Sequence, residues 1–141
     1  MDSIDYNILK LLKNDGRISH EKIAQVVKLS RPAVRSRIVA MEQAGIIEGY
    51  STLVNYDAFG FNIRVFVYVK VMNMSYKNVI RAIYDAVPNQ LMIEEYFRIS
   101  GEWCILLHVM CHSQENITTF VDEILRIESV VATNTVFIFK S

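Results

Sequence analysis

Apolar residues recur at intervals of three and four in three stretches of the first 45 residues, and this spacing predicts three short helices. A serine precedes each stretch and supplies the side-chain oxygen that a helix N-terminus needs, so we expect N-caps at Ser3, Ser19 and Ser30. The side chains expected to face inward are Ile4, Ile8, Leu11 and Leu12 in the first helix, Ile23, Val26 and Val27 in the second, and Val34, Ile38 and Met41 in the third.

The third predicted helix has the clearest limits. Pro32 lies in its first turn, where the missing N–H of proline costs no hydrogen bond, and Gly45 marks its end. Residues 46–54 then form a short β-branched run broken by a glycine, which is typical of a two-stranded hairpin. Residues 55–61 show no period and contain Gly60, so we expect a linker there.

From residue 62 onward, stretches with a strand period alternate with stretches that have a helical period. Two helices are predicted here. One begins after Ser75 and ends before Pro88, and the other begins after Ser113. The order β-α-β-β-α-β predicts a ferredoxin-like sandwich, in which two helices cover one face of a four-stranded sheet. The other face would lie bare, and a large bare apolar face on a small domain usually marks a partner surface, so we expect a homodimer. The expected strands span residues 62–72, 91–100, 103–111 and 130–140.

Composition narrows the class of protein. The 141 residues are 52% hydrophobic and carry no formal net charge, which excludes a disordered chain. The longest stretch without a charged residue, the twelve residues from Trp103 to Gln114, is shorter than the roughly 18 of a membrane span. Residues 1–5 lack the basic and apolar regions of a signal peptide, so we expect a cytoplasmic protein. Cys104 and Cys111, about 23 Å apart on one strand, would be too distant for a disulfide.

The zero net charge hides an uneven distribution. Residues 17–37 contain six basic residues and the single acid Glu21, whereas residues 51–141 contain nine acids and seven bases. The basic segment coincides with two short helices joined by the turn Lys28–Ser30 and followed by the predicted hairpin. This arrangement predicts a winged helix-turn-helix that binds the major groove of duplex DNA. The alternative is that the cations form only a solvated face, or that the three helices mediate protein contacts.

Helical geometry assigns roles within the third helix. With its apolar stripe facing inward, the helix presents Pro32 and Ser36 outward, while Arg35 and Arg37 lie on the flanks, where phosphates would be contacted. Because the outward face is small and weakly polar, we expect weak sequence preference. The candidate DNA-binding residues are Ser30, Arg31, Pro32, Ala33, Arg35, Ser36 and Arg37.

Catalytic chemistry is not predicted. The sequence contains no phosphate-binding loop and no nucleophile elbow. Cys104, His108, Cys111 and His112 resemble a metal-ligand cluster, but a strand would point Cys104 and His108 to one face and Cys111 to the other, and no second ligand pair follows. We therefore expect no enzyme activity, no metal site and no cofactor.

Short motifs follow one another along nearly the whole chain. They are Ile4–Leu12, Asn14–Arg17, Leu29-Ser30, Val34–Ile38, Gly45–Ile47 with Gly49-Tyr50, Ser100–Trp103 and Thr133–Thr135. In this ordered combination the chain resembles the Lrp/AsnC (feast/famine) transcriptional regulators. The resemblance implies a homodimer whose sheets pack face to face, often assembled into octamers as a tetramer of dimers, with duplex DNA bound by paired N-terminal domains.

The same resemblance implies a small effector, commonly an amino acid, bound between regulatory domains near the glycine turn at Gly101. Family members usually carry an aspartate three residues after that glycine, where this chain has Cys104, and a thiol cannot pair with an ammonium group as a carboxylate does. Either the effector differs, or Glu102 or another acid substitutes, or the protein has no amino-acid response. The candidate effector-binding residues are Gly101, Glu102, Trp103, Cys104, Thr133, Asn134 and Thr135.

The predicted fold class is α+β, with a winged helix-turn-helix at residues 1–54, a linker at 55–61 and a βαββαβ domain for dimerisation and effector sensing at 62–141. The expected function is a DNA-binding transcriptional regulator. Two alternatives stay open: an effector-independent DNA-binding or architectural regulator, and a metabolite-binding module or enzyme without DNA binding. The convergent titratable residues that an enzyme would need are not visible in the second domain.

Overall fold

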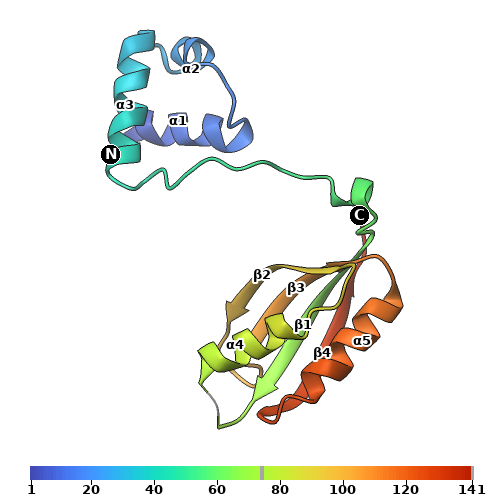
Figure 1. The fold of residues 1–141 in the computed structure, drawn as a ribbon. Coiled ribbons are helices and arrows are strands. Elements are labelled where there is room, and N and C mark those ends of the chain that lie inside the picture. Colours follow the sequence, from blue (N-terminus) through green and yellow to red (C-terminus); the bar gives the residue numbers. More distant parts are fainter. Residues whose placement is uncertain (74, 141) are drawn as a thin grey trace. The chain divides into compact units, whose positions relative to one another are not determined.

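A computed structural model describes residues 1–73 and 75–140, and the chain forms two compact units, Met1–Val54 and Asn55–Ser141 (Figure 1). Each unit has its own hydrophobic core. None of the helices in the described residues is long and apolar enough to cross a lipid bilayer.

The first unit contains three helices, as the apolar spacing predicts. Ser19 and Ser30 cap the second and third, because each hydroxyl accepts a backbone N–H from three residues further along. The first helix is capped by Asp2 and not by Ser3, because Asp2 and Asp5 each accept the backbone N–H of the other in a capping box. The helices are α1 (Ser3–Asn14), α2 (His20–Val27) and α3 (Arg31–Gln43).

The core of this unit confirms most of the predicted inward positions. Val34, Ile38 and Met41 of α3 are buried, as predicted. Val26 of α2 is 60% exposed, and Ala24 is buried in its place. At 100° per residue, Ala24 and Val27 lie on the same side of the helix as Ile23, whereas Val26 points away from it. The remaining buried residues of the unit are Ile8 of α1 and Ile23 and Ala24 of α2.

The hairpin predicted for residues 46–54, and with it the wing, is wrong for the single chain, because none of these nine residues lies in a strand. The backbone N–H groups of Ile46 and Ile47 both bond to the carbonyl oxygen of Met41, at 2.9 and 3.1 Å, and so complete the C-terminus of α3. A hairpin of two short strands is marginal without a third strand or a packing surface.

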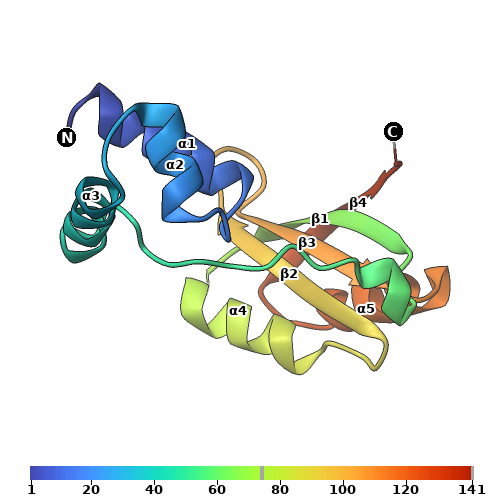
Figure 2. The same cartoon turned by 90° about the horizontal axis from the view of Figure 1, so that it is seen from above.

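The second unit is the predicted ferredoxin-like sandwich. Its sheet has the order β2-β3-β1-β4 with every neighbouring pair antiparallel, and α4 and α5 lie on the same face of it (Figure 2). Residues 55–61, predicted as a linker, belong to this unit and contain a short 3-10 helix. The elements are η1 (Tyr56–Phe59), β1 (Ile63–Val71), α4 (Tyr76–Asp85), β2 (Leu91–Arg98), β3 (Ile105–Cys111), α5 (Gln114–Leu125) and β4 (Val130–Ile138).

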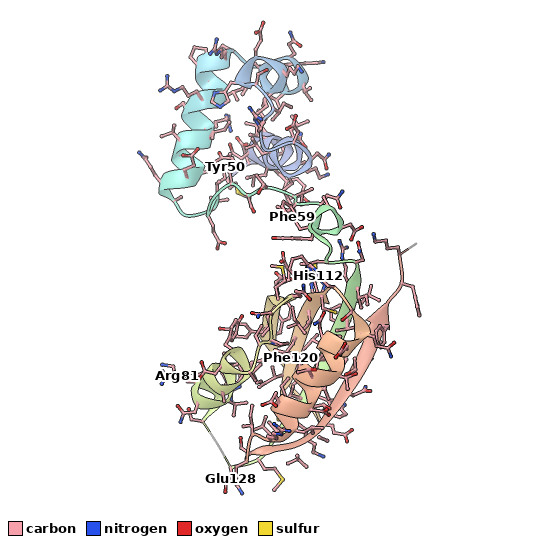
Figure 3. All side chains as sticks on the ribbon, turned by 45° about the vertical axis from the view of Figure 1, so that its right-hand side comes forward. Tyr50, Phe59, Arg81, His112, Phe120 and Glu128 are labelled. Carbon is pink, nitrogen blue, oxygen red and sulfur yellow. The ribbon has the colours of Figure 1, made fainter. Side chains whose placement is uncertain are left out.

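Strict alternation along β1 separates the two faces of the sheet. Val65, Val67 and Val69 are fully buried beneath the helices, where Phe120 of α5 also packs (Figure 3). Because paired residues of neighbouring strands share a face, the register defines the opposite surface, which the two helices do not cover and which we call the open face. It consists of Arg64, Phe66, Tyr68 and Lys70 of β1, Met92, Glu95 and Phe97 of β2, Leu106, His108 and Met110 of β3, and Ala132, Asn134, Val136 and Ile138 of β4.

Candidate functional site

The basic surface of the first unit centres on the N-terminus of α3. Arg31, Pro32 and Arg35 line a hollow of about 510 Å³ together with His20, the first residue of α2. The cap at Ser30 starts α3 at a defined residue, and Lys28 in the left-handed conformation (φ 59°) turns the chain between α2 and α3. Two guanidinium groups and an imidazole therefore line one hollow, and the charge of the two arginines favours a phosphate group there.

The outward face of α3 agrees with its predicted geometry. Arg31, Pro32, Arg35 and Ser36 are exposed, and Ala33 is half-buried at the edge of the core. The capping residue Ser30 is also exposed. These six predicted residues thus lie on or beside one surface of the helix-turn-helix.

Arg37 is engaged elsewhere. Its Nη1 donates to both carboxylate oxygens of Asp2, each at 2.9 Å, and to Oδ1 of Asp5 at 3.0 Å. These hydrogen bonds raise the pKa of Arg37, while the backbone N–H of Asp5, and then Arg37, lower the pKa of Asp2. Two carboxylates neutralise this guanidinium, so its charge holds α1 against α3.

His20 is not among the residues that the sequence pattern predicted for DNA binding. The residue is half-buried, yet it contributes to the same hollow as Arg31 and Arg35. A signal was present, because His20 directly follows the cap Ser19, as Arg31 directly follows the cap Ser30. His20 and Arg31 are each the first residue of a helix, and the fold brings these two helix N-termini to the same hollow.

The glycine turn of the second unit lies between β2 and β3. Gly101 has φ 99°, a conformation that favours glycine, and no atom lies within 4 Å of the position of a Cβ there. Glu102 forms an exposed ion pair with Lys70 at 3.8 Å, and the ring of Trp103 packs against Tyr68 with centroids 6.2 Å apart. The Sγ of Cys104 donates to the carbonyl oxygen of Val71 at 3.7 Å, so this thiol is a structural contact.

The structure divides the other predicted effector residues between the two faces of the sheet. Thr133 and Thr135 pair with Val69 and Val67, whose side chains are buried beneath the helices. Asn134 pairs with Tyr68 and lies on the open face, beside the Tyr68–Trp103 contact. Asn134 and Trp103 therefore share a surface, and the two threonines do not reach it.

The cysteines and histidines that resemble a metal-ligand cluster in the sequence do not lie together in the structure. His108 pairs with Phe66 on the open face, whereas Cys111 is fully buried in the core, where burial raises the pKa of its thiol. Cys104 precedes β3, which begins at Ile105, and packs at the edge of the helix-side core instead of sharing the face of His108. Within residues 1–73 and 75–140, no three His, Cys, Asp or Glu side chains are placed to hold a metal ion.

Both units of the chain match domains of one protein family. A profile of the AsnC-type helix-turn-helix domain matches residues 1–42, and a profile of the Lrp/AsnC ligand binding domain matches residues 64–141. The chain belongs to the Lrp/AsnC family of transcriptional regulators. Like that family, it is a DNA-binding regulator with a helix-turn-helix and a ligand-binding type of second domain.

Named Lrp/AsnC relatives match the chain over most of its length. It is 35% identical over 126 residues to the HTH-type transcriptional regulator LrpB of Bacillus subtilis, covering 89% of this chain and 82% of that protein. It is 33% identical over 136 residues to the leucine-responsive regulatory protein of Rhizobium meliloti, covering 96% and 83%. The solved structure of B. subtilis LrpC superposes with a TM-score of 0.82 at 30% identity, covering 100% of this chain and 96% of that one.

Proposed function

We propose that this Lrp/AsnC regulator binds duplex DNA as a homodimer, with α3 of each subunit in the major groove. The hollow formed by His20, Arg31 and Arg35 is the observation that carries the proposal, because it places two arginines side by side at the exposed N-terminus of α3. Ser30, Arg31, Pro32, Ala33, Arg35 and Ser36 are proposed to face the DNA. Arg37 is proposed to position α3 and not to contact phosphate, since Asp2 and Asp5 neutralise it.

A salt series of DNA-binding measurements tests the role of the hollow. Arg35→Ala should weaken binding to duplexes of any sequence and reduce the slope of log affinity against log salt by about 1, because each phosphate contact releases about one counterion. The matched control is Arg81→Ala, since Arg81 is an exposed arginine on α4 in the other unit (Figure 3). Equal slopes for both variants would remove Arg35 from the phosphate contacts.

The homodimer is proposed to form through the open face. This face carries two aromatic rings on β1 together with Phe97 and Val136, which are 45% and 43% exposed in the single chain. Val136→Glu should convert the protein to monomers in light scattering, because a carboxylate would be buried without a partner. Leu125→Glu, at a residue of α5 that is 46% exposed, is the control and should leave the dimer intact. Assembly of dimers into an octamer is a further proposal that the same measurement tests.

An amino acid or a related metabolite is proposed to bind the second unit and to shift the assembly or the spacing of the paired DNA-binding units. The match to a ligand binding domain supports a response of this kind. A thermal-shift screen with the twenty amino acids tests it, because a ligand at 100 times its Kd stabilises the folded protein by about 2.7 kcal/mol. Without any shift, the protein is an effector-independent regulator. In either form we propose a cytoplasmic protein without enzyme activity.

A further inference from the structure

The two edge strands of the sheet differ in how well they are protected against pairing with another chain. In the order β2-β3-β1-β4, the strands β2 and β4 lie at the edges, so each has a row of backbone N–H and C=O groups that points away from the sheet (Figure 1). β2 carries Glu94, Glu95 and Arg98, and its register with β3 shifts between Ile93 and Glu95. Charged side chains and bulges of this kind hinder pairing at an edge, so β2 is protected.

β4 lacks this protection over most of its length. None of its nine residues, Val130–Ile138, carries a charge, and most of them are the β-branched residues that favour strands. Its register with β1 shifts only at the start, where Val131 is the extra residue, and then runs regularly from Ala132 to Ile138. A long, regular and uncharged edge of this kind pairs readily with a further strand.

We propose that β4 pairs antiparallel with β4 of a second copy of this chain and so joins one dimer to the next. A strand without charges is complementary to itself, whereas a charged residue would meet its own like charge near the two-fold axis. The whole regular run pairs when Thr135 meets Thr135 of the second copy, so that Ala132 meets Ile138 and Thr133 meets Phe137. The pair of Thr133 with Phe137 joins a β-branched side chain to an aromatic ring, a combination that stabilises neighbouring strands.

The edge of β4 stays accessible when the open face is covered. Its outward N–H and C=O groups lie in the plane of the sheet, so a second sheet packed on the open face leaves them free to pair. Phe137 pairs with Val65, whose side chain is buried beneath the helices, so the ring of Phe137 lies on the helix side, and yet it is 40% exposed. A second strand beside β4 would cover part of this ring and satisfy the outward backbone groups.

The β4 edge supplies the contact between dimers that a larger assembly needs, and this role rests on the open-face dimer proposed above. A tetramer of dimers can be built from two different two-fold contacts on each subunit, one at the open face and one at the β4 edge. The pairing of two strands is marginal by itself. We therefore expect it to join dimers into a closed ring, in which each dimer is held at two edges, and not to hold single chains together.

Analytical ultracentrifugation of the full chain over a range of protein concentrations tests the contact. The wild type should form assemblies larger than a dimer. Thr135→Lys should leave the dimer intact and weaken the association of dimers about tenfold at low salt, because two ammonium groups would face each other across the axis. Glu94→Lys, which places the same side chain at an exposed position of the other edge strand, is the control and should associate like the wild type. Circular dichroism verifies that both variants are folded.

A mixture of oppositely charged variants tests the register even if each substitution costs some stability. Thr135→Asp alone should also remain a dimer. An equimolar mixture of Thr135→Asp dimers and Thr135→Lys dimers should recover the larger assembly, because dimers that alternate around a ring of four place opposite charges at every contact. Added salt should weaken association in the mixture and strengthen it in each single variant.

Three results would overturn the inference. The first is a wild type that stays dimeric at every concentration, and the second is a mixture that stays dimeric. The third is a Thr135→Lys variant that becomes monomeric, because β4 would then belong to the contact within the dimer. Gel shifts with the same samples separate the two proposals: dimers that bind DNA and never assemble further defeat only this inference, and an assembly that depends on Thr135 but does not bind DNA defeats only the proposed DNA function.

Discussion

The guanidinium of Arg37 and the carboxylates of Asp2 and Asp5 join the start of α1 to the middle of α3. Arg37→Ala should therefore speed amide hydrogen exchange in the first turn of α1 and in α3. The same variant should leave the salt slope of DNA binding unchanged, because a neutralised arginine releases no counterions. Hydrogen-exchange mass spectrometry and a salt series measure the two effects, with Arg35→Ala as the variant that should change the slope. A reduced slope for Arg37→Ala would restore its sequence-based assignment to phosphate.

The ion pair between Asp2 and Arg37 makes the stability of the first unit depend on pH. The N–H of Asp5 and the guanidinium of Arg37 lower the pKa of the Asp2 carboxyl in the folded state. Its stabilising contribution is therefore fully present above the unfolded pKa, near 3.9, and is lost as the pH falls through the lowered folded value. Asp2→Asn should be less stable than the wild type at pH 6, and the difference should vanish in acid. Thermal unfolding followed by circular dichroism between pH 6 and pH 2 measures it, and a constant difference would contradict the assignment.

Gly60 lies where no other residue fits. Its φ is 88°, and a Cβ would lie 2.8 Å from Cε1 of His112, whose ring also packs edge-on against Phe61 with centroids 4.6 Å apart (Figure 3). Gly60→Ala should destabilise the second unit by about 1–2 kcal/mol from backbone strain alone. Urea unfolding followed by the fluorescence of Trp103, the one tryptophan, reports on this unit. Gly49→Ala meets no atom within 4 Å and is the control; equal midpoints would refute the expectation.

At the scale of elements, α3 depends on its cap. The Oγ of Ser30 accepts the N–H of Ala33 at 3.2 Å, so Ser30→Ala should destabilise the first unit by about 1 kcal/mol, whereas Ser30→Asp should retain the cap. Ser36→Ala, at an exposed position of the same helix, should change stability by less than about 0.5 kcal/mol. Hydrogen exchange of the first turn of α3 without DNA measures the difference. Equal protection in Ser30→Ala and Ser36→Ala would mean that the cap adds no stability.

The elements also show where sequence reasoning succeeds. Regular apolar spacing predicted all three helices of the first unit, both helices of the second and its four strands, because a helix or strand must bury one face. The hairpin at residues 46–54 failed because β-branched residues alone do not specify a partner strand, and the N–H groups of Ile46 and Ile47 bond to the end of α3. All seven predicted DNA-binding residues lie on one helix and its cap, so helical geometry placed them together. It did not predict the ion pairs of Arg37 with Asp2 and Asp5.

At the scale of the whole molecule, a dimer formed through the open faces of the second units would carry two DNA-binding units, which would bind one duplex together. The monomeric variant Val136→Glu should bind DNA more weakly than the wild type, with a salt slope about half as steep, because only one α3 reaches the duplex. Gel shifts over a salt series measure this, and Leu125→Glu should behave as the wild type. An unchanged slope for the monomer would show that a single subunit makes all the phosphate contacts.

The sequence by itself determined the elements, their order and the local basic excess from Arg17 to Arg37, because periodicity, capping residues and charge are properties of neighbours along the chain. Only the tertiary structure decided which distant groups meet. It brought Arg37 to Asp2, set Asn134 apart from Thr133 and Thr135, and packed Trp103 against Tyr68. These contacts join residues that are far apart in sequence, so they depend on strand register and helix packing, which no local pattern encodes.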